Sequence, residues 1–242
     1  MQWSDEGIVL SARPHGETSA IAELLTSSHG RHLGLVRGGR SRRMRPVLQP
    51  GNLVQANWRA RLSEHLGGYT VELVDAHAAR VLDDRAGLAG LTTLTTLARL
   101  LPEREPHARL FEATRLVLEA LAGSEYWPVL LVRWELGLLK ELGFGLDLGA
   151  CAATGATGNL VYVSPKSGRA VSRDGGEAYK DKLLPLPGFL LPGNGEGASP
   201  TSSDVADGFR LTGFFLNKHV WSARELKPPS ARERLIALLS AD

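Results

Sequence analysis

Short apolar runs divide the first 80 residues, and two of them, at 54–62 and 69–76, alternate hydrophobic and polar residues with the period of two that is typical of β-strands. In residues 54–62 one face is apolar and the other polar: Val54, Ala56, Trp58, Ala60 and Leu62 against Gln55, Asn57, Arg59 and Arg61. Other short apolar runs cover 7–14, 19–26, 33–38 and 69–76, and turns rich in glycine, serine or proline separate them. Five short strands in this stretch predict a small antiparallel barrel.

The pattern changes after residue 82, where apolar residues recur at the three- and four-residue intervals of helices. Three stripes are visible: Leu88, Leu91, Leu94, Thr95, Ala98 and Leu101; Leu110, Thr114, Val117 and Leu121; Leu131, Trp134, Leu138 and Leu142. Pro102, Pro106 and Pro128 lie near the expected boundaries, and GFG at 143–145 ends the third helix. These residues predict a helical bundle.

The rest of the chain mixes turns, short apolar runs and helices. Residues 147–185 are rich in glycine around the run NLVYVS, and 191–204 is expected to be an exposed loop. A helix over about 204–219 should begin at an SSD cap, and PPSARERLIALL predicts a final helix. The expected buried side of the first of these helices is Phe209, Leu216 and Val220. We therefore predict an α+β chain with a strand-rich domain at 1–81 and a helical domain at 82–242.

The composition is that of an ordinary globular protein, since 43% of the 242 residues are hydrophobic and 22% are charged. No apolar run reaches the roughly 18 residues that a membrane span needs, and the polar opening MQWSDEG does not resemble a secretory signal. The single cysteine, Cys151, excludes an internal disulfide and fits a reducing cytoplasm. We therefore expect a cytoplasmic protein that does not bind a membrane.

Positive charge is concentrated in one stretch, although the formal net charge is only +2. No acidic residue lies between Glu23 and Glu64, and this window holds Arg31, Arg37, Arg40, Arg42, Arg43, Arg45, Arg59 and Arg61. Five of these arginines lie within residues 37–46, RGGRSRRMRP. Guanidinium groups bind phosphate oxygens in pairs and stay charged, so the stretch favours phosphate binding. The alternative is a solvated loop or a protected edge strand, but such segments normally mix signs or use lysine.

Aromatic residues do not form an obvious stacking platform beside these arginines. Trp58 and Tyr69 lie on apolar strand faces, so we expect both in the core. His15, His29 and His32 are expected to be surface residues. Contacts with nucleic acid should therefore be mainly with the phosphate backbone, and sequence preference should be weak.

Two cations interrupt the apolar pattern of the third predicted helix. Arg133 and Lys140 either pair with other helices or form a basic rim beside a hydrophobic groove that takes an acidic, apolar peptide. Spacing alone favours helix pairing.

Residues typical of a metal or catalytic site are missing. Cys151 has Thr154, Ser172 and Gly175 where further ligands would be needed, and these cannot hold zinc, so we expect no metal and no cofactor. No G-x-x-x-x-G-K-[ST], H-E-x-x-H or G-x-S-x-G motif occurs. The adjacent acids at 83–84 are better explained as a helix start than as a catalytic pair. We therefore expect a protein that is not an enzyme.

Several segments together resemble the RecO family of bacterial recombination-mediator proteins. They are EGIVLSARPHGETSAIAELLTSSHGRHLGLVRGGRSRR near the start, QPGNLV and RWELGLLKELGFGLDLGACAATG in the middle, and SARELK near the end. The resemblance covers nearly the whole chain and implies an N-terminal OB-fold, a helical bundle and an inserted zinc-finger-like hairpin at about 147–185. Members with zinc carry two Cys-x-x-Cys pairs; three of those four positions are Thr154, Ser172 and Gly175 here, so the hairpin is expected without zinc.

The resemblance also implies a function and partners. It implies binding of single- and double-stranded DNA and annealing of complementary strands. It further implies binding of RecR and of the C-terminal tail of single-stranded DNA-binding protein, so that RecA is loaded onto DNA. The family's DNA-contacting residues match Arg37, Arg40, Arg42 and Arg43, and its tail-binding arginine matches Arg133.

Two other interpretations stay open on the sequence. An RNA-binding or ribosome-associated OB-fold protein would need the same arginines, and a preference for single-stranded DNA over RNA would separate the two. A metal-dependent nuclease would need a carboxylate cluster, and the arginine-rich stretch has none.

Overall fold

The computed structural model describes residues 1–191 and 199–240. The chain divides into two compact units, residues 1–124 and 125–242. Within the described ranges, no helix is both long and apolar enough to cross a membrane. The expected change from strands to helices near residue 81 lies inside the first unit, so the domain limits 1–81 and 82–242 stay a prediction.

The first unit begins with a five-stranded sheet: β1 (Gln2–His15), β2 (Ser19–Thr26), β3 (Gly30–Val36), β4 (Leu53–Arg59) and β5 (Gly68–Asp75). The strands close into a barrel in the order β1-β2-β3-β5-β4. β1 pairs with both β2 and β4, and its register with β2 shifts between Val9 and Ser11. Neighbours are antiparallel except β3 and β5, which share only the parallel pairs Leu35–Gly68 and Val36–Tyr69. The five predicted strands are confirmed.

The barrel encloses most of the apolar face that the alternation predicts. Trp58 is 2% exposed and belongs to the core of the barrel together with Tyr69, as expected. The prediction was wrong for Leu62, which is 47% exposed. Because β4 ends at Arg59, the alternation after that residue no longer describes a strand.

Helices α1 (Met44–Val47), α2 (His77–Arg80), α3 (Arg85–Ala98) and α4 (Ala108–Leu121) belong to the same unit. Asp84 caps α3, since its carboxylate accepts a hydrogen bond from the backbone N–H of Ala86. α3 packs against α4, and the predicted stripes of these two helices are buried except at Leu88, which is 39% exposed. Leu101 lies just beyond the end of α3 and is also buried. The acids at 83–84 therefore mark a helix start, as expected.

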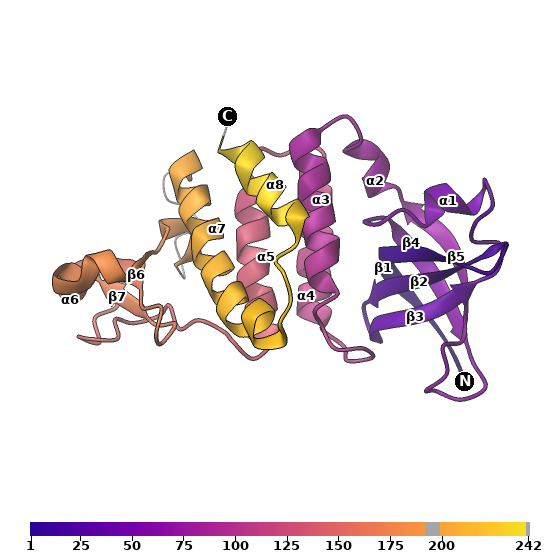
Figure 1. Cartoon of the computed structure of the whole chain (residues 1–242), viewed down its shortest axis with the longest axis horizontal. Helices are drawn as coiled ribbons and strands as arrows, with labels where there is room; N and C mark the ends of the chain where they lie inside the picture. Colours follow the sequence, from indigo (N-terminus) through magenta and orange to yellow (C-terminus); the bar gives the residue numbers. More distant parts are fainter. Residues whose placement is uncertain (192–198, 241–242) are drawn as a thin grey trace. The chain divides into compact units, whose positions relative to one another are not determined.

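The second unit contains α5 (Trp127–Glu141), α7 (Ser202–Leu216) and α8 (Ser230–Leu239), which lie side by side in Figure 1. A π-helical turn, η4 (Asn217–Trp221), and a short 3-10 turn, η5 (Ser222–Arg224), follow α7. The expected buried residues of this region are confirmed as buried: Phe209, Leu216 and Val220.

The start of α7 differs from the prediction. Its cap is Thr201, whose hydroxyl accepts a hydrogen bond from the backbone N–H of Asp204. The Asp204 carboxylate accepts in turn from the backbone N–H of Thr201 at 2.8 Å. This reciprocal capping box satisfies two backbone donors, so the helix begins at residue 202 instead of about 204.

A buried ion pair connects α8 to α5 and α7. Arg232 is 6% exposed, and its Nε and Nη2 donate to the two carboxylate oxygens of Glu135 at 2.8 and 2.9 Å. Nη2 also donates to the backbone carbonyl of Phe209 at 2.8 Å. Glu135 is fully buried, so each charge depends on these bonds to replace its lost hydration.

Between α5 and α7 the chain forms a small sheet of β6 (Leu160–Val163), β7 (Ala170–Ser172) and β8 (Leu184–Pro185), in the order β7-β6-β8. Short turns accompany it: α6 (Arg173–Gly176), η1 (Glu177–Lys182) and η2 (Gly188–Leu190). This sheet occupies the glycine-rich segment identified in the sequence. The expected loop at 191–204 includes residues 192–198, which lie outside the described residues.

Candidate nucleic-acid interface

Of the eight arginines between Glu23 and Glu64, seven are exposed to solvent: Arg37, Arg40, Arg42, Arg43, Arg45, Arg59 and Arg61. We call them the arginine surface. Among the residues that the structure describes, no carboxylate forms an ion pair with any of the seven. Like charges gathered without counter-charges create a positive potential that attracts polyanions.

The arginine loop, residues 37–46, is anchored at Arg40. Its Nη1 donates to the carbonyl of Gly16 at 2.8 Å, and its backbone N–H donates to the carbonyl of Thr18 at 3.0 Å. These bonds hold the loop beside the turn between β1 and β2. The guanidinium groups of Arg42 and Arg43 have no hydrogen-bond partner among the described residues, so they are available to a ligand. The last part of the loop is not extended, because α1 begins at residue 44.

Arg31 differs from the other predicted phosphate ligands. Its side chain is 16% exposed, it forms an ion pair with Glu23, and its Nε donates to the carbonyl of Leu101 at 2.6 Å. Glu23 also accepts from Nε of Arg99 at 2.7 Å. Burial raises the pKa of Glu23, but the bonds from Arg31 and Arg99 outweigh it and hold that pKa below its usual value. Arg31 thus stabilises the first unit internally, and this geometry argues against a role in binding phosphate.

A groove of about 590 Å³ opens at the seam between β3 and β5. Two parallel backbone pairs are too few to seal this part of the barrel wall. Apolar side chains of Val36, Met44 and Val71 line the groove, and Arg37 and Arg59 are its two charged lining residues. We call this hollow the seam groove. It combines apolar side chains with unpaired guanidinium groups, and such cations suit the phosphates of nucleic acid.

An aromatic cluster at one side of the barrel was not predicted from the sequence. Trp3 stacks on His29 with ring centroids 4.2 Å apart, and His29 Nδ1 lies 2.9 Å from a carboxylate oxygen of Asp5. His32, expected at the surface, is 4% exposed, and its Nδ1 donates to the carbonyl of Leu33 at 2.9 Å. Burial lowers the pKa of His32 to about 4, so the ring is neutral near pH 7. His32 therefore belongs to the core and not to a DNA contact.

The two cations predicted in the second unit are both exposed. Arg133 and Lys140 are seven residues apart, so they lie on the same side of α5, two turns from each other. Nε and Nη2 of Arg133 donate to the carbonyl of Phe189 at 3.0 and 2.7 Å. This partner is neutral, and no described carboxylate pairs with either cation, so no ion pair compensates either charge.

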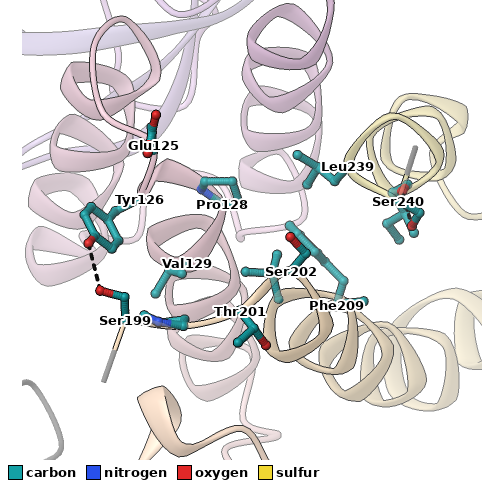
Figure 2. A pocket seen from close by; sticks show the side chains of 14 residues that line it. Glu125, Tyr126, Pro128, Val129, Ser199, Thr201, Ser202, Phe209, Leu239 and Ser240 are labelled. Carbon is teal, nitrogen blue, oxygen red and sulfur yellow. Dashed lines mark hydrogen bonds between the residues drawn. The ribbon is translucent and has the colours of Figure 1, made fainter. Parts of the chain in front are cut away.

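A groove of about 510 Å³ lies at the start of α5, where α7 begins and α8 ends (Figure 2). Val129 and Phe209 are among its apolar lining residues, and a hydrogen bond of 3.2 Å joins the hydroxyls of Tyr126 and Ser199 at its edge. We call it the helical groove. Arg133 is one helical turn from Val129, so it lies beside this groove without lining it.

The four positions compared with zinc ligands lie together beside β7. The backbone N–H and the hydroxyl of Ser172 donate to Sγ of Cys151 at 3.2 and 3.3 Å. A Cβ built on Gly175 would lie 3.1 Å from that sulfur and 3.4 Å from Cγ2 of Thr154. Within the described part of the chain, no three His, Cys, Asp or Glu side chains are grouped to hold a metal. Cys151 is 1% exposed, so its thiol is buried beside these residues.

Comparison with known proteins decides the family. The model described as Recombination protein O N terminal matches residues 1–77, and the model described as Recombination protein O C terminal matches residues 82–227. A DNA repair protein RecO from Methylobacterium nodulans is 57% identical over 100% of this chain and 99% of its own length. Proteins of the same name from Methylorubrum extorquens and Mesorhizobium japonicum are 54% and 53% identical, over 98% and 99% of this chain and 98% and 94% of their own lengths. This chain belongs to the RecO family.

Membership of the RecO family gives the chain a role in DNA repair and recombination. The N-terminal RecO match ends just after β5, so it covers the whole barrel and the arginine surface. The C-terminal RecO match begins before α3 and ends after η5, so it includes Arg133, Lys140 and Cys151. Both candidate binding surfaces therefore lie within the parts of the chain that are characteristic of the family.

Proposed function

We propose that this RecO-family chain is a recombination mediator that binds single- and double-stranded DNA and anneals complementary strands. With RecR, in the bacterial cytoplasm at the nucleoid, it helps to load RecA onto single strands coated with single-stranded DNA-binding protein. The arginine surface carries the proposal, because its exposed guanidinium groups have no carboxylate partner among the described residues. Such a concentration of like charge is self-repulsive until a polyanion neutralises it.

The barrel supports DNA binding as an OB-fold. Five strands in the closed order β1-β2-β3-β5-β4, with α1 between β3 and β4, agree with the small five-stranded barrel of that fold. OB-folds bind oligonucleotides on one face with the help of flanking loops. The arginine loop follows β3 and is anchored beside the β1–β2 turn, so it is placed to act as one of those loops.

The helical domain is proposed to bind the C-terminal tail of single-stranded DNA-binding protein. An acidic, apolar peptide would place its apolar residues in the helical groove and its carboxylates toward Arg133 and Lys140. Support comes from the position of Arg133, one turn along α5 from the groove residue Val129. The remaining donors of its guanidinium group are free to meet a carboxylate.

The segment at about 147–185 is proposed to be a zinc-finger-like hairpin that holds its shape without zinc. Its sheet of β6, β7 and β8 brings the four ligand positions together. Hydrogen bonds from Ser172 to the Cys151 sulfur join two of these positions directly. We assign this segment a structural role and no metal-dependent chemistry.

Annealing of complementary oligonucleotides tests the two surfaces together. We expect Arg40, Arg42 and Arg43 changed together to Ala to abolish DNA binding and annealing on bare and on coated strands alike. We expect Arg133→Ala to anneal bare strands normally and to fail only on strands coated with single-stranded DNA-binding protein. If the wild-type protein neither binds nor anneals DNA, the proposal is wrong and the arginine surface serves another anionic partner.

The alternative is an RNA-binding or ribosome-associated OB-fold protein, because phosphate contacts do not distinguish RNA from DNA. Competition between single-stranded DNA and RNA of equal length and sequence decides between them, and we expect DNA to be preferred. We propose no catalytic activity. Cleavage of labelled DNA in the presence of Mg²⁺ or Mn²⁺ would contradict this part of the proposal.

A further inference from the structure

Gly68 is a glycine that the fold does not require. Its neighbour Gly67 has φ +64°, and a Cβ there would lie 2.4 Å from the Trp58 ring. Across the seam, a Cβ on Gly34 would lie 2.3 Å from the ring of Tyr69. Gly68 has neither constraint: its φ lies outside the left-handed region, and a Cβ would meet only the carbonyl of Leu35, at an ordinary 3.5 Å. Glycine inside a strand weakens it, so it marks places where a ligand or another backbone approaches closely.

Gly68 lies where two hollows of the barrel surface adjoin. Gly68 lines the seam groove of about 590 Å³ and also a second hollow of about 460 Å³. Arg59 and Thr70 are the other residues that line both hollows. The two hollows therefore adjoin at Gly68, and a side chain there would stand between them.

The chemistry of this continuous track fits one unpaired strand of nucleic acid. Met44 is partly buried and offers apolar surface to the flat face of a base, and Arg37 and Arg59 offer guanidinium groups to its phosphates. The second hollow adds polar side chains, among them Asn57. A duplex stacks its bases inside, so only an unpaired nucleotide presents a base face to such a floor.

We propose that the seam groove is a subsite for unpaired nucleotides, and that the absence of a side chain at Gly68 makes it accessible. This inference rests on the proposed DNA-binding function and adds a division of labour to it. The arginine loop binds phosphates of single and double strands alike, whereas the seam groove binds only single strands. Gly68 is then a residue that determines specificity for single-stranded DNA.

Substitutions that fill the groove test the proposal in the full-length protein. Gly68→Ala, Gly68→Val and Gly68→Leu place progressively larger side chains in the track. We expect Gly68→Val to weaken binding of a dT oligonucleotide about tenfold, which corresponds to about 1.4 kcal/mol. Binding of a duplex of equal length should change by less than about twofold, because phosphate contacts remain. Fluorescence anisotropy on both substrates at one salt concentration measures this.

Gly158→Val is the matched control, because Gly158 also has φ outside the left-handed region and no heavy atom within 4 Å of a built Cβ. It should leave both affinities unchanged. Thermal unfolding of the Gly68 variants should be unchanged or slightly raised, since a β-branched residue suits a strand better than glycine does. A merely structural role for Gly68 would instead lower the unfolding temperature together with both affinities.

The outcomes separate this inference from the proposed function. Wild-type affinity of Gly68→Val for the dT oligonucleotide, or equal losses on both substrates, would overturn the subsite while DNA binding stands. Absence of DNA binding by the wild type would overturn the proposed function itself. Ultraviolet crosslinking of a 5-iododeoxyuridine oligonucleotide to the wild type is independent of any variant. We expect the crosslinked peptide to contain Gly68 and Thr70, which line both hollows and lie outside the arginine loop, and a crosslink confined to peptides outside the groove would contradict the proposal.

Discussion

Arg31 and Arg42 are the same residue type in opposite surroundings. Arg31 is held by Glu23 and a backbone carbonyl, whereas Arg42 is exposed and has no hydrogen-bond partner among the described residues. We predict that Arg31→Ala lowers the free energy of unfolding by about 2 kcal/mol, because buried Glu23 loses a charged hydrogen bond. Arg42→Ala should leave stability unchanged and weaken DNA binding. Urea denaturation and anisotropy measure the two effects, and a loss of DNA affinity in Arg31→Ala without destabilisation would contradict this assignment.

His32 should make the barrel sensitive to mild acid. Its pKa is about 4 in the folded protein and about 6.5 when unfolded, so the unfolded chain takes up protons first as pH falls. The associated stability is fully present above pH ~6.5 and is lost as pH falls toward ~4. Between pH 7.5 and pH 5 this single group should account for a loss of about 2 kcal/mol.

His32→Gln checks that assignment because glutamine does not titrate. The variant should be less stable at pH 7.5, yet lose about 2 kcal/mol less than the wild type on going to pH 5. Denaturant unfolding at both pH values gives the comparison. Identical pH dependence of the two proteins would show that other groups, such as the buried His77, dominate.

At the scale of elements, the side chain of Arg232 connects α8 to α5 and α7 through hydrogen bonds. Arg232 satisfies Glu135 on α5 and a carbonyl on α7, and Glu135 has no exposure to water. We predict that Arg232→Ala lowers the free energy of unfolding by about 3–5 kcal/mol, because it leaves an unpaired buried charge. Arg234→Ala on the exposed side of α8 should change it by less than about 0.5 kcal/mol. Thermal unfolding of both variants measures this, and equal effects would contradict a special role for Arg232.

Element boundaries depended on details that patterns describe only in part. The apolar stripe of α7 predicted its buried side correctly, but the predicted cap was SSD, whereas the observed cap is the earlier Thr201. The reciprocal bonds between Thr201 and Asp204 selected the earlier start. The apolar face of β4 was predicted correctly up to Trp58, whereas Leu62 followed the same alternation without being in a strand.

At the scale of the whole molecule, local charge matters more than net charge. The chain carries only +2, yet its arginine surface is free of carboxylate partners among the described residues. If about four phosphates of a single strand are neutralised, log Kobs against log salt should have a slope of about −3. The variant with Arg40, Arg42 and Arg43 changed to Ala should bind too weakly for its slope to be measured. Arg133→Ala should keep the wild-type slope, and a wild-type slope near zero would exclude the arginine surface as the binding site.

The sequence by itself determined the number of strands, the buried stripes of the helices, the concentration of arginine and the family resemblance. Each of these depends on periodicity or residue chemistry within short stretches of sequence, and these do not change with the tertiary structure. The tertiary structure alone decided which arginines are free. Arg31 donates to the carbonyl of Leu101, 70 residues away, so its guanidinium group is not free to bind a ligand. Arg37 and Arg59, in contrast, line the same groove. Burial and pairing depend on residues that folding brings together, so the environment of Gly68 and His32 could not be predicted from their neighbours in sequence.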